Sequence, residues 1–247
     1  MKLITDGLII GEQSVGEKDR LVTALTRKSG VIRAFVKNCK SLKSAKGAAT
    51  RLLCYSRLSI YCGRDTYIID DAVCEEMFIN LRNDIEDMSL SQYFCELSEH
   101  FAPKETDAED FLRLILNALY LLNKKKRPAK LIKAVVELRM MCISGYMPDL
   151  VCCSFCKCYE SEEMYFLPYS GKLVCFGCIS KSNEHSIKIP RSVVTAMRHC
   201  VYSEFNKLFS FKLSPNGTEL LERCSEEYIL YTSEHNFKTL AFYKNIK

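Results

Sequence analysis

Alternating apolar and polar positions dominate the first third of the chain. This period-2 pattern is typical of strands that bury one face. Turn residues separate the runs, notably Ser29-Gly30 and Gly63-Arg64-Asp65. Five short strands with glycine turns predict a small closed barrel. The predicted strands span residues 3–10, 20–27, 31–37, 52–61 and 66–75.

After about residue 80 the apolar positions follow a helical period instead. The segments 89–92 and 106–109 each match a capping box, so both predict helix starts. Pro128 and Gly145 bound a third helix that ends near Ser144. The predicted helices cover about 90–101, 107–123, the segment up to Ser144, 191–209 and 216–232. We therefore expect an α+β protein, with a barrel domain at 1–80 and an α-helical domain at 81–247, interrupted by an insertion at about 150–180.

Composition supports a folded protein without a membrane segment. Apolar residues make up 48% of the 247 residues, which is ample for a core. The first residues contain Asp6 and no long apolar run, so they do not resemble a signal peptide. The most apolar segment, 111–122, is too short to cross a bilayer. We expect a cytoplasmic protein, associated with the nucleoid if it binds DNA.

Charge is distributed unevenly. The net charge is +5, and nine of the 35 lysines and arginines lie in residues 20–51, which contain no acidic residue. The remaining 26 are outnumbered by the 30 acidic residues. A one-signed surface on barrel strands fits a phosphate backbone and favours the five-stranded oligonucleotide-binding (OB) fold. The candidate DNA-binding residues are Arg20, Arg27, Lys28, Arg33, Lys37, Lys40, Lys43, Lys46 and Arg51, with Phe35 and Tyr55 as possible stacking residues.

A cysteine cluster predicts a metal site in the insertion. Cys153 and Cys156 form one CxxC pair, and Cys175 and Cys178 form a second, 18 residues further on. Two such pairs supply the four thiolates of a closed, tetrahedral zinc site, so we expect about one structural zinc per chain in a zinc-ribbon-like segment. Cys152 and Cys158 offer the alternative pairs Cys152-x3-Cys156 and Cys153-x4-Cys158.

Motifs for catalysis are missing from the sequence. It contains no P-loop, dinucleotide fingerprint, HExxH or GxSxG motif. No H-x-E motif accompanies the CxxC pairs, as a zinc deaminase would require. We therefore expect a protein that is not an enzyme and has no catalytic residues.

Several segments resemble the bacterial recombination mediator family RecO. The run at 16–27, Gly-Glu-Lys-Asp-Arg-Leu-Val-Thr-Ala-Leu-Thr-Arg, is similar to the opening signature of that family. Gly30-Val-Ile-Arg33-Ala34, Lys37 and Gly47-Ala48 continue the similarity. Pro148 before the CxxC pairs and Lys238-Thr239-Leu240 extend it across nearly the whole chain.

The resemblance implies a role in recombinational DNA repair. It implies binding to single- and double-stranded DNA, ATP-independent strand annealing, and action on single-strand-binding protein. It also implies that RecR is a partner and that the two help to load RecA. Two other functions stay open on the residues alone: a general OB-fold and zinc-ribbon nucleic-acid module, and a protein–protein adaptor that does not bind DNA.

Overall fold

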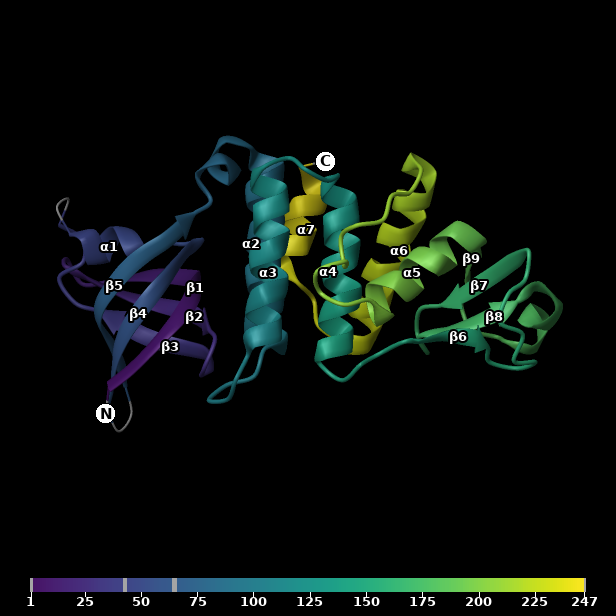
Figure 1. Cartoon of the computed structure of the whole chain (residues 1–247), viewed down its shortest axis with the longest axis horizontal. Helices are drawn as coiled ribbons and strands as arrows, with labels where there is room; N and C mark the ends of the chain where they lie inside the picture. Colours follow the sequence, from purple (N-terminus) through teal and green to yellow (C-terminus); the bar gives the residue numbers. More distant parts are fainter. Residues whose placement is uncertain (1, 42–43, 64–65, 247) are drawn as a thin grey trace. The chain divides into compact units, whose positions relative to one another are not determined.

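The computed structural model describes residues 2–41, 44–63 and 66–246. Lys43 and part of the predicted turn at Gly63-Arg64-Asp65 lie outside these ranges. The chain forms two compact units, one of Met1–Lys124 with Phe237–Lys247 and one of Lys125–Asn236. Strands come first, helices follow, and the cysteine-rich segment interrupts the helices (Figure 1). The α+β class is confirmed, whereas the functional domain boundary near residue 80 stays a prediction.

A closed five-stranded barrel opens the first unit, in the order β1-β2-β3-β5-β4. Strand β3 pairs with β5 in parallel, and every other neighbouring pair is antiparallel. This arrangement confirms the OB-fold barrel. The strands are β1 (Lys2–Val15), β2 (Asp19–Thr26), β3 (Gly30–Val36), β4 (Cys54–Cys62) and β5 (Tyr67–Met77).

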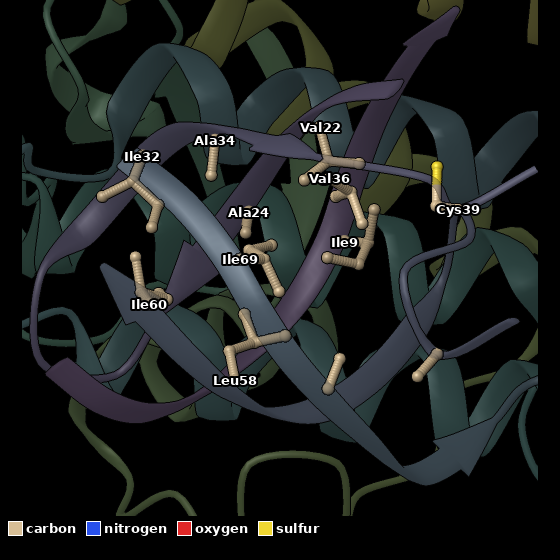
Figure 2. Close-up of a cluster of buried hydrophobic side chains, with 12 residues drawn as sticks. Ile9, Val22, Ala24, Ile32, Ala34, Val36, Cys39, Leu58, Ile60 and Ile69 are labelled. Atoms are coloured by element: carbon tan, nitrogen blue, oxygen red, sulfur yellow. The ribbon is translucent and has the colours of Figure 1, made fainter. Parts of the chain in front are cut away.

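Alternate residues of these strands fill the barrel interior (Figure 2). Small residues, Ala24 and Ala34, lie on neighbouring strands beside bulkier aliphatic chains, which lets a narrow barrel close without voids. The side chains that converge are Ile9, Val22, Ala24, Ile32, Ala34, Val36, Cys39, Leu58, Ile60 and Ile69. The five predicted strands therefore correspond to the strands that build this core.

A short helix, α1 (Ala45–Ala49), lies between β3 and β4 and was not predicted from the sequence. Ser44 caps it, because its Oγ accepts a hydrogen bond of 3.0 Å from the Gly47 N–H. A Cβ on Gly47 would lie 1.9 Å from the Cys39 carbonyl oxygen, so this close approach requires glycine.

Helices of the first unit cover the outer face of β1 and β2. This unit contains η1 (Ile79–Asn83), α2 (Ile85–Phe101), α3 (Glu109–Asn123) and α7 (Lys238–Asn245). Both α2 and α3 contact β1. Leu8 and Leu25, which alternate with the barrel interior, are consequently fully buried. At the predicted turn, Gly30 adopts a positive φ of 59°. The N–H of the next residue, Val31, donates a hydrogen bond to the carbonyl of Pro103, which lies between α2 and α3.

The predicted capping boxes do not start the helices. Asp84 caps α2, accepting from the N–H groups of Glu86 and Asp87, so Ser89 lies inside the helix. Helix α3 begins at Glu109, whose N–H is bound by Asp107 and not by Thr106. A nearby carboxylate acceptor outcompeted the serine and threonine hydroxyls in both places.

Helix α7 depends on a distant carboxylate. Glu96 on α2 accepts hydrogen bonds from the N–H groups of Lys238 and Thr239 and from the Thr239 hydroxyl. A negative charge at a helix N-terminus satisfies orphan N–H groups and favours the helix dipole. This contact spans more than 140 residues of sequence, so the local pattern did not predict the helix.

The second unit combines three helices with a small sheet of order β6-β8-β7-β9. Helix α5 ends at Tyr202, so the predicted helix at 191–209 was too long. The elements are α4 (Ala129–Ile143), β6 (Asp149–Cys153), β7 (Glu163–Leu167), β8 (Lys172–Cys175), η2 (Phe176–Lys181), β9 (Ile187–Pro190), α5 (Arg191–Tyr202) and α6 (Pro215–Ser233).

A buried ionic network joins α4 to α6. Lys133 and Glu137 are both 0% exposed, and the Lys133 Nζ lies 2.9 Å from Glu137 Oε1 and 2.8 Å from Glu226 Oε2. The Ser225 hydroxyl donates to Glu137 Oε2 at 2.6 Å. Burial opposes the charge of Lys133, but the attraction of both carboxylates outweighs it and raises its pKa. The ammonium therefore holds two helices together in the core.

Replacing Lys133 with alanine should strongly destabilise the second unit. The change leaves a buried carboxylate without its cation, which typically costs about 3–5 kcal/mol of unfolding free energy. Urea unfolding followed by circular dichroism measures the loss. Lys130→Ala is the matched control, because Lys130 lies one turn earlier in an exposed pair with Glu219 and should cost about 0–1 kcal/mol. Equal losses for the two variants would contradict the role given to the buried network.

Candidate nucleic-acid interface and metal centre

Two tight turns bring four cysteine sulfurs together. Cys153 ends β6, Cys175 ends β8, and Cys156 and Cys178 lie three residues after them. The four sulfurs lie within 4.8 Å of one another, and those of Cys156 and Cys175 are 3.6 Å apart. Four sulfurs at this spacing match the donor set of a closed tetrahedral site, with no position left for substrate.

Backbone hydrogen bonds shape the first turn around its sulfur. Lys157 adopts a positive φ of 63° and donates its N–H to the Cys153 carbonyl at 3.0 Å. Burial opposes ionisation of Cys153, but N–H groups of Cys156, Cys175 and Phe155 outweigh it and lower its pKa to about 6. A thiol that ionises readily is prepared to ligate a metal.

The parallel pairing of β6 with β8 holds the two turns beside each other. Cys153 pairs with Leu173, and the Ser154 N–H donates to the Leu173 carbonyl at 2.8 Å. Strands β7 and β8 form the hairpin expected between the CxxC pairs. The group of four sulfurs does not include Cys152 or Cys158, although the Cys158 thiol interacts with the thiols of Cys156 and Cys175.

The basic residues of the 20–51 stretch fall into different environments. Arg20 precedes the inward-facing Val22 by two positions, so its side chain points into the end of the barrel and is only 8% exposed. Its guanidinium donates to the carbonyls of Gly47 and Thr50, at 3.3 and 3.1 Å, and pairs with Glu12. Arg20 therefore anchors the C-terminal end of α1, although the sequence suggested a phosphate contact.

Arg27 is also engaged within the protein. Its guanidinium pairs with Asp6 on β1 and with Glu109 at the start of α3. It also donates a hydrogen bond to the Tyr55 hydroxyl at 3.4 Å. Tyr55, one of the two suggested stacking residues, is therefore bound within the protein. These bonds connect the barrel to the helix that covers it.

The other described cations of the stretch lie in different parts of the barrel domain. Lys28 lies at the β2–β3 turn, whereas Lys37 and Lys40 follow the opposite end of β3. Arg51 is exposed, and Lys46 is half-buried within α1. The basic residues of the 20–51 stretch, which form one acid-free run in the sequence, therefore lie at separate places in the structure.

One face combines cations with an aromatic ring. Arg33 is exposed on the outer side of β3, and Phe35, two positions on, is half-buried on the same side. Their partners on β2 are Thr23 and Leu21. The β2–β3 face of an OB barrel is where oligonucleotides bind.

Lys18 extends this face and was missed in the sequence. It lies exposed in the β1–β2 turn, and its carbonyl accepts from the N–H groups of Cys39 and Lys40, at 3.0 and 3.3 Å. The Lys40 ammonium donates to the Gly16 carbonyl in the same turn at 2.7 Å. Glu17 and Asp19 flank Lys18 in the sequence, so Lys18 lies outside the acid-free stretch of residues 20–51.

None of the helices within residues 2–41, 44–63 and 66–246 has the length and hydropathy needed to span a bilayer.

Comparisons with known proteins agree with this architecture. The family description "Recombination protein O N terminal" matches residues 1–78, and "Recombination protein O C terminal" matches residues 82–241. A protein of Acetivibrio thermocellus named "DNA repair protein RecO" is 30% identical over 244 residues, which cover 99% of this chain and 97% of that protein. Proteins of the same name from Caldicellulosiruptor saccharolyticus and Alkaliphilus metalliredigens are each 28% identical over the full length of both chains. The chain therefore belongs to the recombination protein O (RecO) family.

Proposed function

We propose that this protein is a recombination mediator in DNA repair. It binds single- and double-stranded DNA, anneals complementary strands without ATP, and works with RecR to load RecA on DNA coated by single-strand-binding protein. It acts in the cytoplasm, at the nucleoid. The observation that carries the proposal is the β2–β3 face, where Arg33 and Phe35 lie on the same side of β3, with the exposed Lys37 and Lys40 after the end of that strand and Lys18 in the adjoining β1–β2 turn.

Annealing needs electrostatics and not covalent chemistry. Two phosphate backbones repel each other, and a cationic surface offsets this repulsion while the bases remain free to pair. Phe35 offers a ring on which a base can stack without regard to sequence. Because no bond is made or broken, the proposed activity requires no catalytic residue, and we propose that the protein is not an enzyme.

We also propose a division of roles along the chain. Residues 1–80 bind nucleic acid, and residues 81–247 form the helical domain with its metal-binding insertion. One structural zinc ion is held by Cys153, Cys156, Cys175 and Cys178. The metal would supply the folding energy that a small four-stranded sheet lacks.

Removing the cations of the β2–β3 face should weaken DNA binding and its dependence on salt. For Arg33→Ala/Lys37→Ala/Lys40→Ala we expect a salt slope that is smaller by about 2, since each phosphate contact on single strands contributes about 0.7. Fluorescence anisotropy with a labelled single strand at several salt concentrations measures it. Lys124→Ala/Lys172→Ala/Lys181→Ala removes the same charge from exposed positions elsewhere. An unchanged slope in the first variant, or equal losses in both, would sink this interface.

Arg20 should affect stability more than DNA binding. The lysine ammonium lies one bond closer to the backbone than the guanidinium nitrogen that makes these contacts and lacks its planar geometry, so Arg20→Lys should lower the free energy of unfolding by about 1–3 kcal/mol. The affinity of the folded variant for DNA should change less than about three-fold, because Arg20 has almost no exposed surface. Denaturant unfolding and anisotropy on the same sample separate the two effects. A large loss of affinity with unchanged stability would restore Arg20 as a phosphate contact.

The metal assignment predicts about one zinc per chain by elemental analysis. Cys175→Ser should remove the zinc and lower the melting temperature, because one ligand of a closed site is lost. Cys158→Ser is the control and should keep both zinc and stability. If the Cys158 variant loses zinc instead, the first pair of ligands is Cys153 and Cys158.

A further inference from the structure

A cavity in the second unit lies away from the cysteine sulfurs, over helix α5 and the segment that follows it toward α6. Its volume is about 440 Å³, within the range of about 300–1,000 Å³ common for small-molecule sites. Arg191, Ala196 and His199 line it from α5, and Phe211, Lys212 and Leu213 line it from the following segment.

The charge of the lining is positive. Arg191 and Lys212 are both exposed, and no carboxylate lines the cavity among the described residues. Lys212 has no ion-pair partner in the described part of the chain. Arg191 pairs with Glu160 at 2.7 Å, but both side chains are well exposed, so an anionic ligand can replace this contact at small cost.

Two rings form the apolar part of the cavity. The centroids of His199 and Phe211 are 5.1 Å apart, with an angle of 63° between the ring planes. The His199 Nε2–H donates to the Lys207 carbonyl at 2.8 Å, which holds the imidazole in place. Ala196 and Leu213 complete the apolar wall.

This combination selects a class of ligand. An apolar compound would not use the charges of Arg191 and Lys212, and an inorganic anion would not contact the rings and Leu213. A nucleotide has both a flat ring and a phosphate, and stacking on an aromatic ring beside cations is how proteins bind single strands.

We infer that this cavity binds one nucleotide of a single-stranded nucleic acid, with its base against Phe211 and its phosphates at Arg191 and Lys212. The inference rests on the proposed function, since annealing brings two strands to one protein. The β2–β3 face would bind one strand and the cavity would bind the other.

The absence of tryptophan from the sequence provides a direct test. Phe211→Trp introduces a single tryptophan at the cavity, and stacking of a base on the indole quenches its fluorescence. We expect a short thymidine oligonucleotide to quench it, and Arg191→Glu/Lys212→Glu in the same background to raise the half-saturating concentration about ten-fold or more. Lys172→Glu/Lys181→Glu changes the charge equally at exposed sites that do not line the cavity and should raise it much less.

A second reporter tests location. Tyr169→Trp places the indole on an exposed side chain outside the cavity lining, where the oligonucleotide should leave its fluorescence nearly unchanged. Equal quenching at positions 169 and 211 would overturn the inference. So would quenching at position 211 by an acidic peptide but not by the oligonucleotide, or binding of tripolyphosphate with no response to the oligonucleotide.

The outcome can be separated from that of the proposed function. Adding Arg33→Ala/Lys37→Ala/Lys40→Ala to the Phe211→Trp chain removes the barrel face, and quenching should persist. If the wild-type protein anneals strands but position 211 never responds, only the cavity assignment fails. If the wild type does not anneal, the proposed function fails whatever the reporter shows.

Should Phe211→Trp not fold, photocrosslinking of an iododeoxyuridine oligonucleotide to the wild-type chain should label the peptide containing Phe211. Labelling only at other peptides would overturn the inference.

Discussion

Closure of the five-stranded barrel is the constraint on which the candidate DNA surface depends. The parallel pairing of β3 with β5 leaves no free edge between them, so each strand residue must point either inward or outward. Val22 and Ala24 point inward, and Arg20 points the same way because alternate residues of a strand share one side. Arg33 and Phe35 point outward. A shift of one residue in register would exchange these roles and bury Arg33 in the core. The distribution of charge on the surface is therefore a consequence of strand pairing and not of composition alone.

The alternation of apolar residues was enough to predict the barrel, because each of its strands buries a face that the sequence reveals locally. It was not enough to sort the nine cations. Arg20 and Arg33 look alike in the sequence, and only the partners of Arg20, the carbonyls of Gly47 and Thr50, show that it is structural. Gly47 belongs to α1 and Thr50 caps its C-terminal end, and this five-residue helix is too short for its periodicity to be detected.

The other differences between the predicted and the observed structure depend on how far apart the interacting residues lie in the sequence. The four sulfurs come from two local turns whose spacing is visible directly, so the cysteine cluster could be predicted from the residues alone. Helix α7 begins where Glu96 accepts its first N–H groups, and the cavity joins α5 to residues 211–213, which the sequence left between two predicted helices. Features that depend on tertiary contacts of this kind leave no periodic signal, and the capping motifs placed the starts of α2 and α3 two to five residues from their true positions.

Two separate binding sites, as proposed above, would let one chain hold two strands at the same time. A strand held on the β2–β3 face and a second held at the α5 cavity would be tethered to the same chain, so their encounter would not depend on two dilute strands meeting in solution. Each contact would still be weak enough to yield when base pairing begins, because exposed cations are screened by salt and exchange their partners readily. Duplex formation removes the unstacked base that a ring such as Phe211 recognises, so the product would bind the cavity less well than the single strand. Release of the annealed duplex would then follow from pairing itself, without a nucleotide to drive it.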